Sequence, residues 1–112
     1  MKQKKEVSIY GTWVSQYNDG YTITESSVVY DDGGYGYGWE GKIEEVSDPY
    51  IYVSINNKYY AVYYSGLKEK DCKFSNAYKA GGKTRTDTLA EAKSEFTVDN
   101  GYYATLGEYK RK

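Results

Sequence analysis

The chain lacks most of the side chains that usually carry out catalysis. It contains 16 tyrosines and a single cysteine, Cys72, but no histidine. Histidine is the usual general base near neutral pH and a common ligand of zinc and haem iron. Without a histidine partner, Cys72 cannot form a Cys–His nucleophile. We therefore predict that the protein is not an enzyme, that it has no catalytic residue, and that it uses neither a metal nor a cofactor.

Three motifs resemble binding or catalytic sites but have simpler interpretations. Residues 33–38 are rich in glycine, yet they follow a hairpin signal and do not precede a helix, as a phosphate-binding loop requires. Asp31 and Asp32 lack the further spaced acids of a calcium loop. Glu44 and Glu45 are neighbours in an expected strand, so their carboxylates point to opposite faces and cannot act as a pair. We interpret these motifs as turn and strand residues.

The charge balance and the lone cysteine limit the possible partners. The 15 basic and 16 acidic residues give a net charge of −1, which argues against a nucleic-acid partner. No apolar run reaches the length of a transmembrane segment.

The cellular compartment is not determined by the cysteine content. Cys72 is the single cysteine and cannot form an intramolecular disulfide. Residues 1–6 lack the apolar region of a signal peptide. If the protein is exported, its signal has been removed, and we favour such an extracytoplasmic place, periplasmic or at the surface.

Alternating apolar residues predict short strands throughout the chain. Aromatic and β-branched residues favour strands, whereas Asn, Asp and Gly favour tight turns such as Asn18-Asp19-Gly20. We expect eight strands at residues 6–17, 21–24, 27–30, 35–44, 50–55, 59–64, 72–79 and 102–110. Residues 1–112 then form a single domain.

One segment changes to a helical period. Thr88 and Glu91 have the spacing of a capping box, and Leu89, Ala92 and Phe96 form a narrow apolar stripe. We therefore expect a helix at residues 88–96.

This order of elements predicts the fold. The class is all-β: an eight-stranded antiparallel up-and-down meander barrel with one short helix before the last strand. Eight strands are about enough to close a barrel without exposed edges. A two-sheet sandwich is the alternative, and it is less favoured because Greek-key crossings need longer connections than most of these turns supply.

The first strand carries a family resemblance. Gly11-Thr12-Trp13 on the opening strand of a meander resembles the lipocalins and, more broadly, the calycin group with the avidins and small bacterial inhibitor barrels. In such barrels the tryptophan closes one end and a late basic residue packs over it. The resemblance therefore implies barrel closure by Gly11, Trp13 and Arg111.

The chain also departs from the lipocalin pattern. The lipocalin helix follows the eighth strand, whereas the helix expected here precedes it, and the later lipocalin motifs are not apparent. The tyrosine-rich strands with their Thr-Leu-Ala-Glu-Ala-Lys helix look like small, lipocalin-like bacterial lipoproteins of unassigned function.

The inside of the barrel is the expected binding site. Small barrels either fill with side chains or hold one ligand. Alternation predicts these inward, ligand-binding residues: Tyr37, Trp39, Tyr60, Tyr64, Phe74 and Tyr78. In the sixth strand the inward set is either Tyr60, Val62 and Tyr64 or Tyr59, Ala61 and Tyr63. We favour the first set because Val62 is more apolar than Ala61. The tyrosines expected to face outward are Tyr50, Tyr52, Tyr59 and Tyr63.

The inward and outward faces of the strands each indicate a function. The first is a non-enzymatic binding protein that holds a small apolar or aromatic ligand in the barrel interior. The alternative is an interaction module or inhibitor-like barrel whose exposed tyrosines contact a protein or a glycan.

Overall fold

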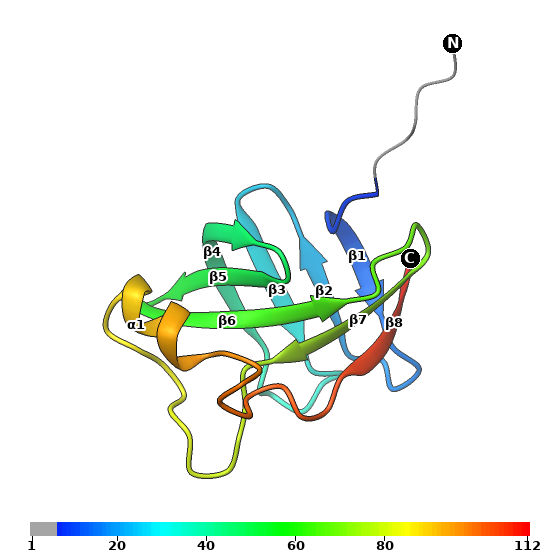
Figure 1. The fold of residues 1–112 in the computed structure, drawn as a ribbon. Coiled ribbons are helices and arrows are strands. Elements are labelled where there is room, and N and C mark those ends of the chain that lie inside the picture. The colour runs from blue at the N-terminus through cyan, green and yellow to red at the C-terminus, as the bar shows by residue number, and fades with distance from the viewer. Residues whose placement is uncertain (1–6) are drawn as a thin grey trace.

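The protein is an eight-stranded antiparallel barrel. The computed structural model describes residues 7–112. Each strand pairs with its neighbours in the chain, and β1 pairs with β8 to close the sheet (Figure 1). The elements are β1 Gly11–Val14, β2 Gly20–Ile23, β3 Ser27–Asp31, β4 Trp39–Ser47, β5 Tyr50–Ile55, β6 Lys58–Ser65, β7 Asp71–Asn76, α1 Leu89–Glu95 and β8 Gly107–Arg111. The predicted meander barrel, with a short helix before the last strand, is confirmed.

The strand register assigns one face of every strand to the inside of the barrel. Trp13 lies opposite Tyr21, and Tyr21 lies opposite Tyr30. Directly paired residues share a face because side chains alternate along each strand. The aromatic residues that this rule places inside are Trp13, Tyr21, Tyr30, Trp39, Tyr60, Tyr64, Phe74 and Tyr109.

Side chains fill the middle of the barrel. Trp13 and Val62 are 0% exposed, and Phe74 is 1% exposed. The Tyr21 ring lies 5.1 Å from the ring of Phe74 and 5.3 Å from that of Tyr109, centre to centre. An eight-stranded barrel is just wide enough for such packing. Side chains, rather than a ligand cavity, therefore occupy the middle of this barrel.

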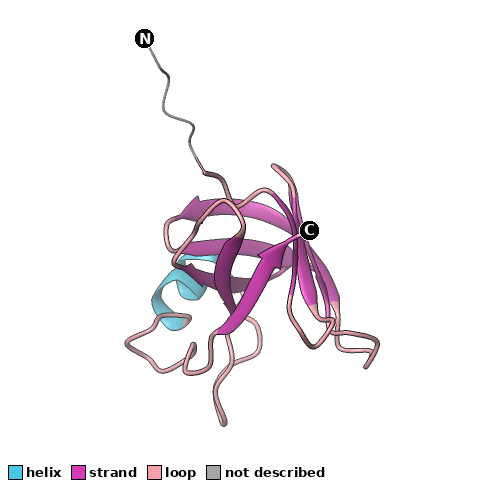
Figure 2. Ribbon diagram, turned by 90° about the vertical axis from the view of Figure 1, so that its right-hand side faces the viewer, coloured by secondary structure: helices cyan, strands magenta, loops and turns pink. Residues whose placement is uncertain are grey.

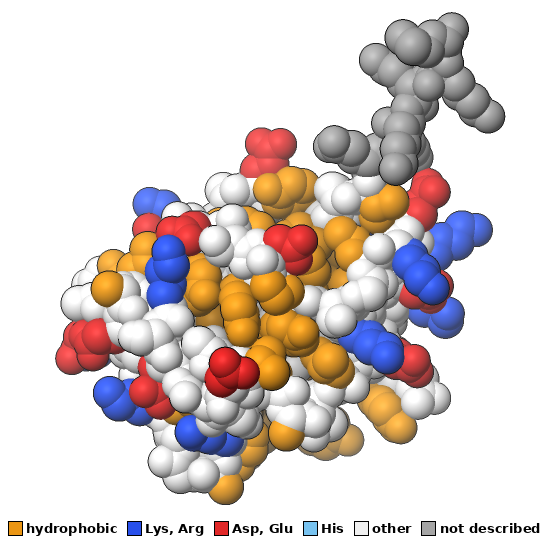
Figure 3. Space-filling view, viewed as in Figure 1, with side chains coloured by type: hydrophobic (Ala, Val, Ile, Leu, Met, Phe, Trp, Pro, Cys, Tyr) orange, Lys and Arg blue, Asp and Glu red, His pale blue; other side chains and the backbone are white. Residues whose placement is uncertain are grey.

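The outward tyrosines of β5 and β6 are at most partly exposed. Tyr52 is 3% exposed, and Tyr50, Tyr59 and Tyr63 are half-buried. The ring of Tyr103, from the long β7–β8 connection, packs 5.2 Å from that of Tyr63. Figure 3 shows the hydrophobic side chains gathered over this face. These rings anchor the connection to the sheet, which corrects the expected binding surface.

The helix α1 begins as its capping box predicts. The Thr88 hydroxyl accepts a hydrogen bond from the Glu91 amide at 3.1 Å and donates one to the Glu91 carboxylate at 3.1 Å. Ala92 and Phe96 are 0% exposed, so the predicted stripe is buried. The helix packs against β5 and β6, and Lys93 forms an ion pair with Glu45 at 2.8 Å.

The fourth strand begins later than expected, and this corrects the position of Tyr37. Residues 32–38 form a loop in which the Asp32 carboxylate accepts hydrogen bonds from the amides of Gly34, Tyr35 and Tyr37. These amides are therefore not free to pair with a neighbouring strand. Tyr37 lies outside the barrel and is 81% exposed.

The seventh strand ends early, which corrects the position of Tyr78. β7 stops at Asn76, and the Tyr78 amide donates to the carbonyl of Tyr102 at 2.8 Å instead of continuing the sheet. The side chain of Tyr78 is 71% exposed. Tyr102 and Tyr103 are buried, at 0% and 6% exposure, and they pack beside Phe96 and Tyr63. The eighth strand consequently begins at Gly107 rather than at residue 102.

Arg111 closes the end of the barrel at which the chain enters β1, which is called the upper end below. Its guanidinium lies 4.2 Å from the Trp13 ring centre and donates to the carbonyls of Ser8, Tyr10 and Glu69, each at 2.6 Å. The indole of Trp13 donates to the carbonyl of Ile9 at 2.8 Å. These bonds hold the segment before β1 across the upper end.

Gly11 makes room for the Arg111 side chain. Its φ is +140°, and a Cβ at this position would lie 2.7 Å from the Arg111 guanidinium. A larger residue here would strain the backbone and displace the arginine.

We predict that Arg111→Met lowers the free energy of unfolding by about 2 kcal/mol, because the charged hydrogen bonds and the contact with Trp13 are lost. Urea denaturation, monitored by tryptophan fluorescence, measures this change in the free energy of unfolding. The matched control is Lys110→Met, whose side chain is 83% exposed. Equal stability of the two variants would show that Arg111 does not secure the upper end.

Candidate functional site

A cleft opens at the lower end of the barrel. The β1–β2 turn, the β3–β4 loop and the long β7–β8 connection lie at this end (Figures 1 and 2). The cleft has a volume of about 650 Å³. Its lining includes Tyr17, Asp19, Tyr21, Tyr30, Phe74, Asn76, Tyr78 and Tyr109. Below, it is called the lower cleft.

The β1–β2 turn places Asp19 at this cleft. The Ser15 amide donates to the Asp19 carbonyl at 2.9 Å, and Asn18 takes a positive φ of 68°. Asparagine tolerates this left-handed conformation better than most residues. The Ser15 hydroxyl also donates to the Asp19 carboxylate. The turn sequence therefore fixes the carboxylate beside the inner face of the barrel.

Two tyrosine hydroxyls from other strands converge on Asp19. Tyr109 of β8 donates to the carboxylate oxygen Oδ2, and Tyr30 of β3 donates to the same oxygen at 3.4 Å. The hydroxyl of Tyr21 donates to Asn76 Oδ1 at 2.9 Å. The inner rings thus carry their hydroxyls toward a polar floor, which the two short side chains Asp19 and Asn76 complete.

Burial keeps these phenols neutral. Desolvation, followed by the charge and hydrogen bond of Asp19, raises the pKa of Tyr30 to about 12. Desolvation, with the hydrogen bond to Asp19, also raises the pKa of Tyr109, and desolvation raises that of Tyr21. At neutral pH the floor therefore presents hydroxyl groups and one carboxylate.

The rim of the cleft combines exposed rings with offsetting charges. Tyr17, in the β1–β2 turn, is 76% exposed, and Tyr78, which follows β7, is 71% exposed. Lys73 and Glu108 also line the cleft and lie opposite each other in the β7–β8 register. An entering ligand would meet two aromatic rings before the polar floor.

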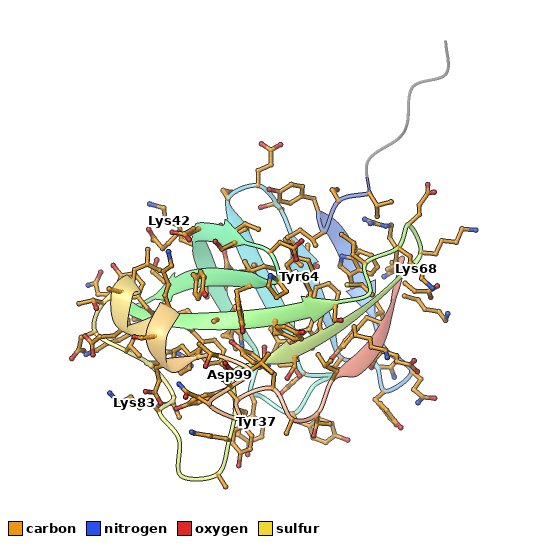
Figure 4. All side chains as sticks on the ribbon, viewed as in Figure 1. Tyr37, Lys42, Tyr64, Lys68, Lys83 and Asp99 are labelled. Carbon is orange, nitrogen blue, oxygen red and sulfur yellow. The ribbon has the colours of Figure 1, made fainter. Side chains whose placement is uncertain are left out.

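The six residues predicted to bind a ligand do not form one site. Phe74 and Tyr78 line the lower cleft, with Phe74 at its buried wall. Tyr64 lines a separate cleft of about 560 Å³ at the upper end, and Figure 4 shows it well apart from Tyr37. Tyr37 projects into solvent from its loop.

Trp39 and Tyr60 pack next to the lower cleft without lining it. Their rings meet edge to face at 5.6 Å, and the Trp39 ring lies 6.1 Å from that of Tyr30. The Tyr60 hydroxyl donates to the carbonyl of Ala77 at 2.7 Å. These two residues support the wall behind Tyr30.

Sequence reasoning missed most of the floor. Period two from Trp13 through the β1–β2 turn would have placed Tyr21 inside, whereas the inward position of Tyr30 follows only from its pairing with Tyr21. Asp19 was interpreted only as a turn residue, and no local signal shows that hydroxyls from β3 and β8 would reach it. The pairing of distant strands creates this site.

Cys72 has no sign of reactivity. It is 2% exposed, and its thiol donates to the carbonyls of Ser65 at 3.6 Å and Lys73 at 3.5 Å. Burial raises the pKa of this thiol to about 11, so it stays protonated.

Searches for other kinds of site in residues 7–112 gave negative results. No group of three or more His, Cys, Asp or Glu side chains there is arranged to hold a metal ion. That part of the chain also contains no helix with the length and apolarity needed to cross a membrane. Comparisons with protein-family models, curated proteins and solved structures gave no match. The functional proposal below therefore rests on the geometry of the lower cleft.

We predict that the protein loses stability above about pH 10. Unfolded tyrosines ionise near that pH, whereas Tyr30 stays protonated until about pH 12 and the pKa values of Tyr21 and Tyr109 are also raised. The unfolded state then binds fewer protons than the folded state, so the free energy of unfolding falls as pH rises. Urea denaturation at a series of alkaline pH values measures the decline.

Tyr109→Phe provides the comparison, because it removes one of the groups with a raised pKa. Its stability should decline less steeply above pH 10 than that of the wild type. Parallel declines in the two proteins would contradict the assignment of alkaline instability to these phenols.

Proposed function

We propose that the protein is a non-enzymatic binding protein that holds a small aromatic molecule in the lower cleft. The observation that carries this proposal is the convergence of aromatic rings and a polar floor in one cleft of about 650 Å³. Sites for small molecules commonly have this size and combine apolar walls with a few placed polar groups. The ligand occupies the lower mouth, because the middle of the barrel is packed.

The exposed rings at the rim support this proposal. Tyr17 and Tyr78 are more than two-thirds exposed although each carries a large apolar surface. An aromatic ligand between them would remove that surface from water and gain ring contacts. Ser75 and Asn76 lie beside these rings in the lining and offer hydrogen-bonding groups.

The closed upper end is consistent with a lipocalin-like protein. Gly11, Trp13 and Arg111 are arranged as the sequence resemblance implies, with the guanidinium over the indole. We include membership of this group in the proposal. Closure of the upper end by this contact leaves the lower cleft as the proposed binding site.

We predict that Tyr17→Ser with Tyr78→Ser weakens the binding of 2-phenylethanol by about tenfold, because two ring contacts are lost. Isothermal titration calorimetry measures the affinity. The matched control is Tyr35→Ser, which removes a ring that is 79% exposed but does not line the cleft.

The control variant should bind 2-phenylethanol as the wild type does. The proposal is wrong if the wild type binds neither 2-phenylethanol nor a charged analogue with the same ring at millimolar concentration, or if the double variant keeps the full affinity of the wild type.

A second candidate function rests on the β3–β4 loop. Tyr35 and Tyr37 are 79% and 81% exposed. The Asp32 carboxylate accepts hydrogen bonds from the backbone amides of both residues. A rigid loop that presents tyrosines loses little conformational entropy when it binds a partner. This observation favours an interaction module that contacts a protein or a glycan.

For this candidate we predict that Tyr35→Ser with Tyr37→Ser abolishes binding to a glycan array or a purified partner without changing the melting temperature. Tyr10→Ser alters a partly exposed tyrosine at the other end of the barrel and serves as the control. Partner binding that survives the double substitution would exclude the loop as the contact surface.

A further inference from the structure

Asp19 is an acid at the lower cleft without a basic partner among residues 7–112. Its carboxylate accepts hydrogen bonds from the hydroxyls of Ser15, Tyr30 and Tyr109. The ion pairs in this part of the chain involve other acids: Asp71, Asp87 and Glu45. The negative charge of Asp19 is therefore held by neutral donors and stays available to a cation.

We propose that the lower cleft selects an organic ammonium ion with an aromatic body, such as a primary arylalkylamine. This inference rests on the proposed function and specifies the chemical class of its ligand. The ammonium group binds Asp19 at the floor, and the aromatic body lies between the rings at the rim.

The Asp19 carboxylate has room for one more donor. Its two oxygens offer about four acceptor positions. Three hydroxyls already donate to them. An ammonium group that takes the remaining position forms a charge-assisted hydrogen bond, which is stronger than one between neutral groups.

Among the described residues, no basic side chain lies over a ring that lines the lower cleft. Elsewhere in the described residues, basic side chains lie over aromatic rings, in the pairs Lys79–Tyr102, Arg85–Tyr60, Lys93–Tyr52 and Arg111–Trp13. None of these rings lines the lower cleft. Tyrosine faces attract cations through the negative charge of their π systems. The cleft therefore combines a carboxylate with aromatic faces that have no cation of their own.

The other charges of the lining leave the charge of Asp19 uncompensated. The lining contains Asp19, Glu108 and Lys73, which together carry two negative charges and one positive charge. Lys73 and Glu108 lie opposite each other across β7 and β8, so their charges offset at the rim. The remaining negative charge is that of Asp19, beside the floor.

A series of three ligands tests this inference in the wild-type protein. 2-Phenylethylamine carries a positive charge at neutral pH, 2-phenylethanol is neutral, and 3-phenylpropionate is negative. All three share the aromatic ring and differ in the polar end. We expect the amine to bind at least about tenfold more tightly than the alcohol, and the acid to bind most weakly. Isothermal titration calorimetry measures the three affinities.

Asp19→Asn removes the charge with little change of shape and should abolish the preference for the amine. The control is Glu40→Gln, which removes an exposed carboxylate that does not line the lower cleft and should keep that preference. The wild-type series tests the inference even if Asp19→Asn does not fold.

The outcomes separate the two proposals. If the alcohol binds as tightly as the amine, or if folded Asp19→Asn keeps the preference, the inference is wrong while the proposed function stands. If none of the three ligands binds at millimolar concentration, both are wrong.

Discussion

Every tyrosine ring buried in this barrel brings a hydroxyl that needs a hydrogen-bond partner. The chain has 16 tyrosines and only two phenylalanines, so tyrosine must supply much of the core. A buried hydroxyl without a partner costs free energy. The described residues have no buried side-chain nitrogen or oxygen without a partner. The hydroxyls of Tyr21, Tyr30 and Tyr109 meet this requirement at one end of the barrel, on Asn76 and Asp19.

The two ends of the barrel place their polar groups in different ways. At the upper end, Arg111 lies over Trp13 and binds carbonyls of the chain before β1, which fixes that segment across the barrel. At the lower end, the hydroxyls and Asp19 form a polar floor under rings that stay exposed. The packed centre supports both ends, and only the lower end combines a floor with an aromatic rim.

Much of the barrel follows from local sequence patterns, but the site depends on contacts between distant segments. Alternation predicted the meander, and the spacing of Thr88 and Glu91 predicted the start of α1. Extending that alternation to Tyr37 and Tyr78 was wrong, because each residue belongs to a segment whose amides bond outside the sheet. Asp19 could not be recognised, because its tyrosine partners come from β3 and β8, which only the closed barrel brings to the β1–β2 turn.

The most direct test of binding at the lower end is nuclear Overhauser spectroscopy of the protein with 2-phenylethylamine. The rings of Tyr17, Tyr78 and Tyr109 line the lower cleft, whereas those of Tyr10 and Tyr64 line the upper one. The account predicts contacts between ligand protons and rings of the lower cleft, and none with the rings of Tyr10 or Tyr64. Contacts with Tyr10 or Tyr64, and none with the lower rings, would contradict it.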